Sequence, residues 1–283
     1  MKKALELRNV SKSYGDFQIQ DMTFSLPAGC ILGLIGKNGA GKTTTIKMIL
    51  NTIHMDSGDI EVLGRSQEKN FETVREDIGV VLDEAGFPEY ATVDRINKMM
   101  KYIYKNWEEN TFYQLVEKFS LPKGKKKFQD YSRGMKMKLA IAVALSHKAK
   151  LLVMDEPTSG LDPVVRDEIL DIFYDFTRQE DHSILISSHL VGDLEKLCDY
   201  VAYLNEGRLE IFQEKDLLME QYGILKGSEE ELRELEPDAI VGSREYGYGI
   251  EALVDKTKIP KGYETEQPTL EQLIVFLARG ERM

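Results

Sequence analysis

A glycine-rich segment, Gly36–Thr44, has the residue types and spacing of a phosphate-binding loop. It fits the pattern G-x-x-x-x-G-K-[ST] and lies between an apolar run, Ile31–Ile35, and a predicted helix, Lys42–Asn51. Glycines let backbone N–H groups converge on phosphate oxygens, and the helix N-terminus adds partial positive charge. The residues predicted to bind a nucleoside triphosphate are Gly36, Lys37, Asn38, Gly39, Ala40, Gly41, Lys42, Thr43 and Thr44. The alternative, a glycine-rich turn with a chance lysine, is disfavoured by the flanking strand and helix.

Two acids at the end of a second apolar run could supply the chemistry. Leu151–Glu156 predicts a buried strand that ends in Asp155 and Glu156. The carboxyl end of such a strand is where open parallel sheets bind ligands. We expect Asp155 and the Thr43 hydroxyl to hold Mg²⁺, and Glu156 to polarise the attacking water as a general base. The alternative is that both acids cap the segment that follows them.

Alternating strands and helices must position these residues. Predicted strands flank the turn at Gly15-Asp16, and others follow along the chain: Ala4–Val10, Gln18–Leu26, Ile31–Ile35, Ile60–Leu63, Ile78–Leu82, Leu151–Met154, Ser183–Ser187 and Val201–Leu204. Helices are predicted at Lys42–Asn51, Phe71–Glu76, Val164–Arg178 and Leu190–Leu197. This alternation predicts an α/β fold with a mainly parallel sheet and an antiparallel N-terminal β part.

Two segments depart from the alternation. The stretch from about Thr92 to His147 has helical periodicity and almost no strand signal, so a helical subdomain is expected at about residues 89–148. After a closing hairpin at Tyr203–Phe212, residues 216–283 carry 15 acidic and 8 basic residues, a net charge of −7. We expect residues 1–215 to form the nucleotide-binding domain, and residues 216–283 a small C-terminal appendage that ends in an amphipathic stretch, Leu270–Ala278.

Composition excludes several classes of protein. The chain has 283 residues, and 37 Lys and Arg against 48 Asp and Glu give a formal charge of −11. This balance argues against sequence-independent binding of nucleic acid. The two cysteines, Cys30 and Cys198, exclude a disulfide scaffold or a zinc ribbon. The apolar runs are far shorter than the roughly 18 residues that span a bilayer, so a cytoplasmic location is expected.

Taken in order, the motifs resemble the ATP-binding subunit of an ATP-binding-cassette (ABC) transporter over about residues 1–215. Gly36–Thr44 and Leu151–Glu156 match the two phosphate-site motifs of that family, and Tyr131–Lys136 resembles its Leu-Ser-Gly-Gly-Gln signature. Ser159–Asp162 matches its dimer-contact loop, Ser187-Ser188-His189 its switch histidine, and Tyr14 the aromatic residue that stacks on adenine. The phosphate-loop NTPase core with a helical insertion is the fold that this resemblance implies.

The resemblance implies a head-to-tail homodimer around two ATP molecules, with Mg²⁺ as cofactor. The signature residues Ser132, Arg133, Gly134 and Met135 would complete the partner's γ-phosphate site, and Asp162 would contact the partner. His189 would sense the γ-phosphate. The alternatives are a core histidine for His189 and ordinary packing for Tyr14. A helix beginning near Met135 would add N–H donors for the anion.

Three residues depart from the family pattern. Tyr131 and Arg133 replace the leucine and the first glycine of the signature. Asp83 stands where the family usually has glutamine and sometimes glutamate, a residue that ligates Mg²⁺ and links the site to the membrane subunit. We expect Asp83 to keep a metal-capable oxygen on a shorter arm, and Glu84 is the alternative ligand.

Two functions are consistent with the sequence. The first is the ATPase subunit of a transporter of single-domain export type, which drives a separately encoded membrane-spanning permease from the inner face of the cell membrane. The second is an ABC ATPase that acts on ribosomes, DNA ends or cluster assembly. The segment Lys118–Lys138 has eight basic residues and one acid. It is either a solvated helical face or a basic face against acidic loops or anionic lipid.

Overall fold

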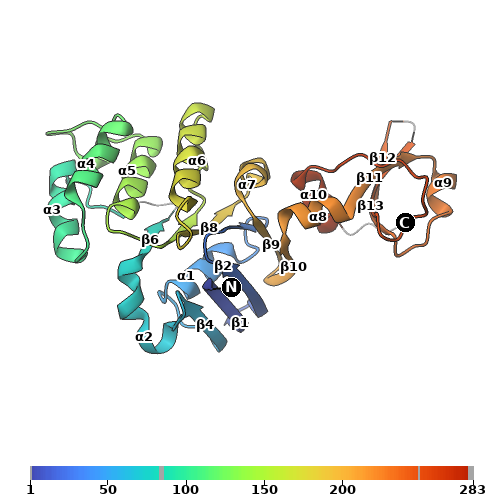
Figure 1. Cartoon of the computed structure of the whole chain (residues 1–283), viewed down its shortest axis with the longest axis horizontal. Helices are drawn as coiled ribbons and strands as arrows, with labels where there is room; N and C mark the ends of the chain where they lie inside the picture. Colours follow the sequence, from blue (N-terminus) through green and yellow to red (C-terminus); the bar gives the residue numbers. More distant parts are fainter. Residues whose placement is uncertain (1, 83–85, 248, 280–283) are drawn as a thin grey trace.

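The computed structural model describes residues 2–82, 86–247 and 249–279, and in these ranges the chain forms three β-sheets. The molecule is elongated (Figure 1). A group of helices lies at one end, the two larger sheets lie in the middle, and the third sheet lies at the other end. Within the described residues, no helix has the length and apolar character needed to cross a membrane.

The central sheet has six strands in the order β10-β9-β3-β8-β7-β6. Five of them are parallel, and β10 pairs antiparallel with β9. The strands are β3 (Ile31–Ile35), β6 (Ile78–Val81), β7 (Leu151–Asp155), β8 (Ser183–Ser188), β9 (Tyr200–Asn205) and β10 (Arg208–Glu214). Every residue of β3, β7 and β8 is buried, which explains why apolar residues follow one another in these strands, since layers cover both faces of the sheet.

A four-stranded antiparallel sheet covers one face, in the order β2-β1-β4-β5. Its strands are β1 (Lys3–Tyr14), β2 (Phe17–Pro27), β4 (Ser57–Val62) and β5 (Arg65–Ser66). Alternate residues such as Met22, Phe24 and Leu26 of β2 are buried, as expected of a sheet with one face in water. Helix α1 (Lys42–Ile49) is buried between the two sheets through Ile46 and Ile49.

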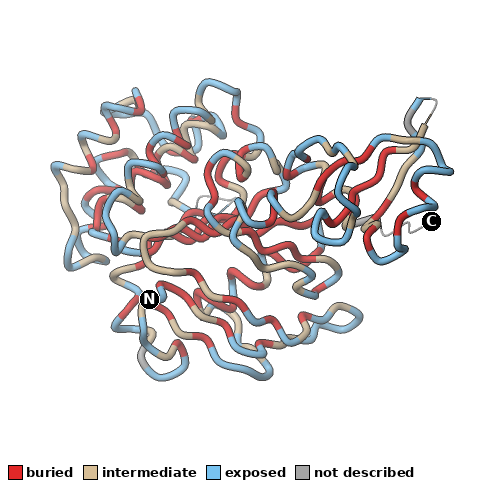
Figure 2. The backbone as a smooth tube through the Cα atoms, turned by 45° about the vertical axis from the view of Figure 1, so that its right-hand side comes forward, coloured by how far each residue is buried: buried red, intermediate tan, exposed pale blue. Residues whose placement is uncertain are grey.

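Helices cover the opposite face of the central sheet. These are α5 (Arg133–Leu145), α6 (Pro163–Thr177) and α7 (Val191–Leu197), while α2 (Gln67–Val74) and the 3-10 helix η1 (Arg75–Asp77) precede β6. On β3, Leu32 and Leu34 point into the core shared with α1, and Ile31 and Ile35 into the core shared with the helices. Figure 2 shows the buried residues concentrated along these strands.

The segment between β6 and β7 is helical and contains no strand in its described part. It comprises α3 (Val93–Ile103), α4 (Glu109–Lys118), the 3-10 helix η2 (Phe128–Asp130) and α5. His147, just after α5, ties this segment to the central part: its ring stacks on Tyr104, with centroids 3.9 Å apart, and its Nδ1 lies 3.0 Å from the carbonyl oxygen of Glu76. Burial lowers the pKa of His147 below its ordinary value of 6.5.

The C-terminal residues form the third sheet, in the antiparallel order β11-β13-β12. Its elements are α8 (Lys215–Gln221), β11 (Tyr222–Gly227), α9 (Glu229–Arg233), β12 (Ile240–Tyr246), β13 (Gly249–Asp255) and α10 (Leu270–Arg279). The sheet has a small core of its own around Leu232 and Val254. In contrast, Leu270 and Leu273 of α10 belong to the same buried cluster as Leu194 of α7.

Most predicted strands and helices are confirmed, with shifted ends. The structure corrects three details: β1 runs on to Tyr14, α2 begins earlier than Phe71, and α5 begins at Arg133 rather than near Met135. The weak strand signals after residue 216 belong to a complete sheet, whose short strands sit on a small core and therefore show little periodicity. The amphipathic stretch Leu270–Ala278 is the helix α10.

Candidate functional site

The glycine-rich loop connects β3 to α1 at the carboxyl end of the parallel strands. Residue 41 is the N-cap of α1 and offers no side chain to the first turn, so the N–H groups there are left for an anion. The backbone of Gly41 has φ +110°, and a Cβ on it would lie 2.5 Å from Cδ1 of Ile19. A Cβ on Gly36 would lie 2.6 Å from the carbonyl oxygen of Leu204. Both positions therefore require glycine.

Lys42 is buried at the start of α1, and its ammonium turns back over the loop. Its Nζ donates to the carbonyl oxygens of Gly36 at 2.7 Å and Lys37 at 3.3 Å. The carboxylate of Glu156 lies 3.6 Å from the same nitrogen. A buried ammonium held by two loop carbonyls and one carboxylate is available to a phosphate group that approaches the loop.

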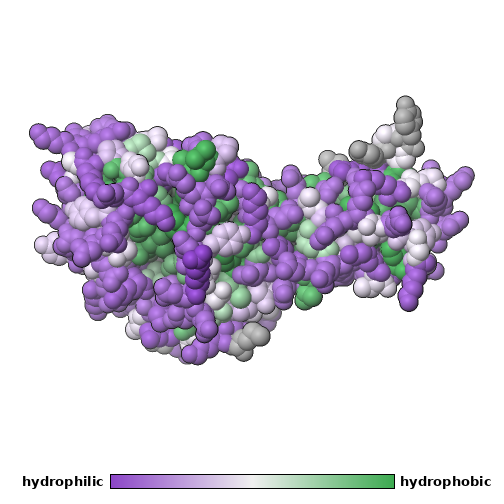
Figure 3. Space-filling model, turned by 45° about the horizontal axis from the view of Figure 1, so that its top comes forward, coloured by the Kyte–Doolittle hydropathy of each residue, from purple (hydrophilic) through white to green (hydrophobic). Residues whose placement is uncertain are grey.

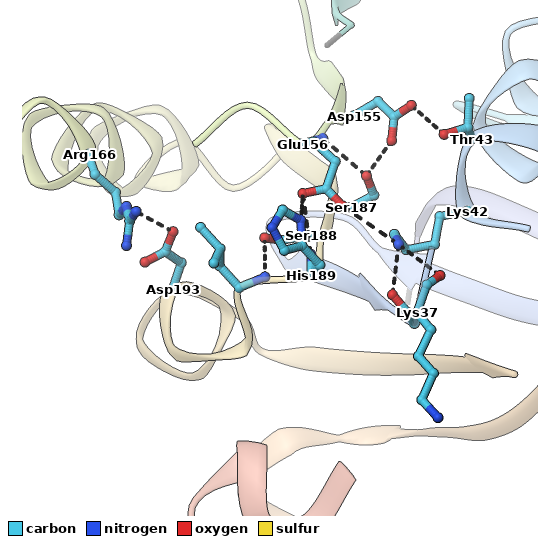
Figure 4. A network of polar contacts seen from close by, with 12 residues as sticks. Lys37, Lys42, Thr43, Asp155, Glu156, Arg166, Ser187, Ser188, His189 and Asp193 are labelled. Atoms are coloured by element: carbon cyan, nitrogen blue, oxygen red, sulfur yellow. Dashed lines mark hydrogen bonds and ion pairs between the residues drawn. The ribbon is translucent and has the colours of Figure 1, made fainter. Parts of the chain in front are cut away.

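The two acids of the second motif take different directions (Figure 4). Asp155, the last residue of β7, is 5% exposed and accepts a hydrogen bond from the Thr43 hydroxyl at 2.8 Å. Glu156 follows in the left-handed region with φ +51°, and this turn directs its carboxylate toward Lys42 and His189. The adjacent strands β3, β7 and β8 thus bring both acids to the phosphate loop.

His189 lies directly after β8 and faces Glu156. Its Nδ1 is 2.6 Å from Oε2 of Glu156, and its backbone N–H donates to the same oxygen at 3.3 Å. The His189 side chain is 43% exposed, so this histidine is not a core residue. The contacts form a continuous polar chain from Lys42 through Glu156 to His189.

A cavity of about 880 Å³ opens over the loop. Its walls include most of the predicted nucleotide-binding and catalytic residues: Lys37, Asn38, Gly39, Gly41, Lys42, Thr43, Thr44, Asp155 and Glu156. Gly36 and Ala40 belong to the loop but do not line the cavity in its described part. The volume suits a small phosphorylated ligand.

The aromatic side chain on the described walls of this cavity is that of Phe17, which no sequence motif predicted. Tyr14 ends β1, is 44% exposed and does not line the described cavity walls; the ammonium of Lys12 lies 5.4 Å from its ring centre. The signal for Phe17 was its place at the start of β2, the strand whose Ile19 contacts the phosphate loop.

The signature segment lies at the N-terminus of α5 and does not line the described walls of its own chain's cavity. Ser132 is the N-cap, and its hydroxyl accepts a hydrogen bond from the Met135 N–H at 3.3 Å. The guanidinium of Arg133 lies against Gly160, where a Cβ would be 2.8 Å from its Nη1. Arg133, the residue that departs from the family pattern, thus contacts the dimer-contact loop of its own chain.

Asp162 and Asp83 are the remaining predicted site residues. Asp162 is the N-cap of α6 and accepts a hydrogen bond from the Val165 N–H at 3.0 Å. The side chain therefore has a local structural role, and its contact with a partner stays a prediction. Asp83 and the alternative ligand Glu84 lie outside the described residues.

Ser187, inside the switch motif, received no role from the sequence. It lies on β8 opposite Asp155 of β7, and its hydroxyl contacts both acids of the site. A polar residue in the last two positions of a buried parallel strand, beside a strand ending in Asp-Glu, is the signal that could have identified it.

Comparisons with known proteins show to which family the chain is similar. The family model described as ABC transporter matches residues 19–159. The bacitracin transport ATP-binding protein BcrA of Enterococcus faecalis is 33% identical over 74% of this chain and 68% of its own length. The lantibiotic transport ATP-binding protein SrtF of Streptococcus pyogenes is 34% identical over 75% of this chain and 91% of its own.

A solved structure of an ATP-binding subunit of an ABC transporter superimposes with a TM-score of 0.71 at 28% identity. The match covers 77% of this chain and 92% of that chain. Sequence and fold therefore agree, and the chain belongs to the ABC transporter family of ATP-binding proteins.

Proposed function

We propose that this chain is the ATP-hydrolysing subunit of a membrane exporter, which dimerises head-to-tail around two ATP molecules and drives a separate membrane-spanning permease. The observation that carries the proposal is the convergence of Lys42, Thr43, Asp155 and Glu156 at one cavity, with His189 in contact with Glu156 behind its described walls. This set provides a phosphate cradle, oxygen ligands and a base, which are the parts that ATP hydrolysis needs.

The loop residues 36–44 bind the triphosphate through backbone N–H groups, the α1 N-terminus and the ammonium of Lys42. Oxygens of Thr43 and Asp155, 2.8 Å apart, fit Mg²⁺, which takes one or two protein oxygens besides phosphate and water. When bound, the ion neutralises charge that develops on the phosphate oxygens.

Glu156 orients the attacking water and accepts its proton, and His189 holds the carboxylate in place through Oε2. The other carboxylate oxygen, Oε1, faces Lys42 at 3.6 Å, so the base and the phosphate-binding cation lie on the same side of the cavity. This places the proton acceptor close to the terminal phosphate that the water attacks.

A second copy of the chain completes the site. The signature residues Ser132, Arg133, Gly134 and Met135 lie away from the described walls of their own cavity, and the exposed N-terminus of α5 offers N–H groups to an anion of the partner. Asp162, in the adjacent loop, contacts the partner. Tyr14 stacks on adenine, and Phe17, which lines the cavity, is the alternative stacking residue. The nucleotide-binding domain spans residues 1–215 with the helical subdomain at about 89–148.

The permease docks on a groove between α2, β6 and the end of α3. The groove has a volume of about 530 Å³ and is lined by Leu82, Tyr102 and Ile103, of which Tyr102 is 93% exposed and Ile103 58% exposed. Such exposed apolar side chains around a groove are typical of a protein interface. Figure 3 shows hydrophobic surface in a hollow among the helices of the otherwise mostly hydrophilic face.

The proposed exporter direction follows from the transport of bacitracin and lantibiotics by the two relatives, and the chain then lies on the inner face of the cell membrane. The basic segment Lys118–Lys138 makes several contacts within its own chain. Lys138 pairs with Glu168 at 2.7 Å, and Lys126, Lys127 and Lys136 lie over aromatic rings. These local contacts favour a structural role for the segment.

Affinity capture from detergent-solubilised membranes tests this function. The tagged chain is expected to co-purify with a multi-spanning membrane protein, and the double substitution Tyr102→Asp, Ile103→Asp should abolish the co-purification while ATP binding persists. Leu217→Asp, at a site that is 52% exposed on α8, is the matched control and should retain the partner. Capture of ribosomes or DNA instead, by a chain that leaves membrane proteins behind, would contradict the transporter assignment.

A further inference from the structure

Ser187 is a buried polar residue to which the proposed mechanism assigns no role. It is the fifth residue of β8 and has no exposed surface. In the parallel register of β7 and β8, it lies directly opposite Asp155. It is separated from His189 by one residue, so three functional positions meet at this corner of the sheet.

The hydroxyl of Ser187 joins the two acids of the site (Figure 4). Its Oγ donates to Oδ1 of Asp155 at 2.5 Å and accepts the backbone N–H of Glu156 at 3.1 Å. A hydroxyl has one proton and two lone pairs, and a carboxylate only accepts, so both directions follow from the chemistry of the groups. The single hydroxyl thus uses its donor on one acid and an acceptor on the other.

The bond to Asp155 fixes which oxygen faces the cavity. With Oδ1 held by Ser187, the other oxygen, Oδ2, is the one that faces Thr43 at 2.8 Å. Without the Ser187 bond, rotation of the carboxylate could exchange the two oxygens. The short bond therefore holds the metal-binding oxygen toward the Thr43 hydroxyl.

The bond to Glu156 supports a strained turn. A glutamate at φ +51° is in a region that residues other than glycine rarely adopt, and such a conformation persists only where its surroundings hold it. Both the Oγ and the carbonyl oxygen of Ser187 accept the N–H of Glu156, each at 3.1 Å. This pair of contacts keeps the Glu156 carboxylate directed toward Lys42 and His189.

We propose that Ser187 is a positioning residue of the ATPase site, whose hydroxyl aligns Asp155 with the metal and holds the turn that directs Glu156. The inference rests on the proposed roles of Asp155 and Glu156 and assigns them a shared support. It also gives a physical reason for a hydroxyl side chain at this position of the buried strand, where an aliphatic residue would satisfy the packing.

The test compares nucleotide affinity with and without the metal. A fluorescent ATP analogue is titrated into the full chain in Mg²⁺ and in EDTA. The ratio of the two affinities measures how much the metal contributes to nucleotide binding. Ser187→Ala should reduce this ratio about tenfold, the usual scale for outer ligands of a metal site, with little change of affinity in EDTA. The kcat of ATP hydrolysis should fall about tenfold as well, since Glu156 loses part of its support.

Two further variants separate positioning from packing. Ser187→Cys preserves the volume but has only a weak donor, so it should behave like Ser187→Ala. Ser183→Ala is the matched control: Ser183 lies at the other end of β8, is equally buried, and its hydroxyl likewise accepts one backbone N–H, that of Gly29 at 3.0 Å. It should keep the ratio and kcat of the parent, with a similar loss of stability.

The inference would be overturned if Ser187→Ala kept the parental ratio of the affinities in Mg²⁺ and EDTA, or if Ser187→Cys recovered it. Either result would leave the proposed function intact. A different result bears on the function itself: if the parent chain shows no effect of Mg²⁺ on affinity and no loss of hydrolysis in Glu156→Gln, then the roles of Asp155 and Glu156 fail first. The parent measurement thus distinguishes the two failures.

Discussion

At the scale of single residues, the ammonium of Lys42 is the main side-chain charge that the loop offers to phosphate. It is 6% exposed and already partly desolvated, and its present partners are two carbonyl oxygens and one carboxylate. Exchanging those partners for phosphate oxygens involves little further loss of hydration. A charged hydrogen bond under these conditions contributes about 1.5–3 kcal/mol.

Lys42→Ala is therefore expected to weaken ATP binding about tenfold to a hundredfold, as measured by titration of a fluorescent ATP analogue. Lys256→Ala, which removes an exposed lysine near the end of β13, is the control and should bind ATP like the parent. An affinity of Lys42→Ala within twofold of the parent would show that backbone donors alone carry the phosphate.

The residue scale also shows what the sequence could predict. The loop, Asp155, Glu156 and His189 follow each other in fixed patterns along the chain, and the structure brings them within hydrogen-bond or ion-pair distance. Phe17 belongs to no sequence motif, and Ser187 lies inside the switch motif but has no role that its spacing predicts. Their positions depend on which strands are neighbours, and that is set by the order of the sheet rather than by the sequence around each residue.

At the scale of elements, α5 begins at the signature segment, and its first turn depends on a side-chain cap. Ser132 caps α5 through the Met135 N–H, and Thr92 caps α3 in the same helical segment through the Arg95 N–H. Loss of either cap destabilises the chain by about 1 kcal/mol. Only Ser132 is proposed to face the ATP of the partner.

The pair of variants Ser132→Ala and Thr92→Ala tests that difference. Both should lower the free energy of unfolding by similar amounts and leave ATP affinity of the isolated subunit unchanged. In a Glu156→Gln background, only Ser132→Ala should reduce the ATP-dependent dimer, measured by analytical ultracentrifugation. Equal dimer formation by the two variants would place Ser132 outside the dimer interface.

The junction between the helical segment and the central part is sensitive to pH through His147. Burial lowers the pKa of His147, against smaller opposing effects of Glu76 and Asp77, and the ring is stacked on Tyr104. Below pH 6.5 the unfolded chain binds a proton at this histidine that the folded chain resists. Stability is therefore complete above that pH and is lost as the pH falls toward the lowered pKa.

In that window, His147 changes the free energy of unfolding by at most about 1.4 kcal/mol per pH unit. Denaturant unfolding between pH 5 and 8 should show a smaller pH slope in His147→Gln than in the parent, after correction for the change in overall stability. His54→Gln, at an exposed histidine, should keep the parental slope. An unchanged slope in His147→Gln would mean that other groups produce the acid sensitivity.

At the scale of the whole molecule, the acidic C-terminal part is not a separate attachment. Its helix α10 packs on α7, the backbone N–H of Leu270 donates to Glu195 at 3.2 Å, and Lys215 donates to the Glu195 carbonyl at 2.8 Å. Since α7 starts two residues after His189, the C-terminal part lies against the helix that follows the switch histidine. The net charge of −7 gave no indication of this contact.

Leu273→Ala should therefore destabilise the entire chain. Leu273 has no exposed surface and shares a core with Leu194 of α7, so the expected cost is about 2–5 kcal/mol in a single unfolding transition. Leu217→Ala, at a leucine that is 52% exposed, should change the free energy of unfolding by less than about 0.5 kcal/mol. A separate early transition in Leu273→Ala would mean that the C-terminal part unfolds independently.

The central claim is that the cavity hydrolyses ATP with Glu156 as the base, and Glu156→Gln tests it most directly. The amide keeps the size and the contact with His189 but cannot accept a proton from water. The measurement is ATP hydrolysis by the purified chain in Mg²⁺, combined with analytical ultracentrifugation in ATP. We predict that hydrolysis falls at least about a hundredfold and that an ATP-dependent dimer accumulates. Hydrolysis at the parental rate, with no accumulated dimer, would contradict the account.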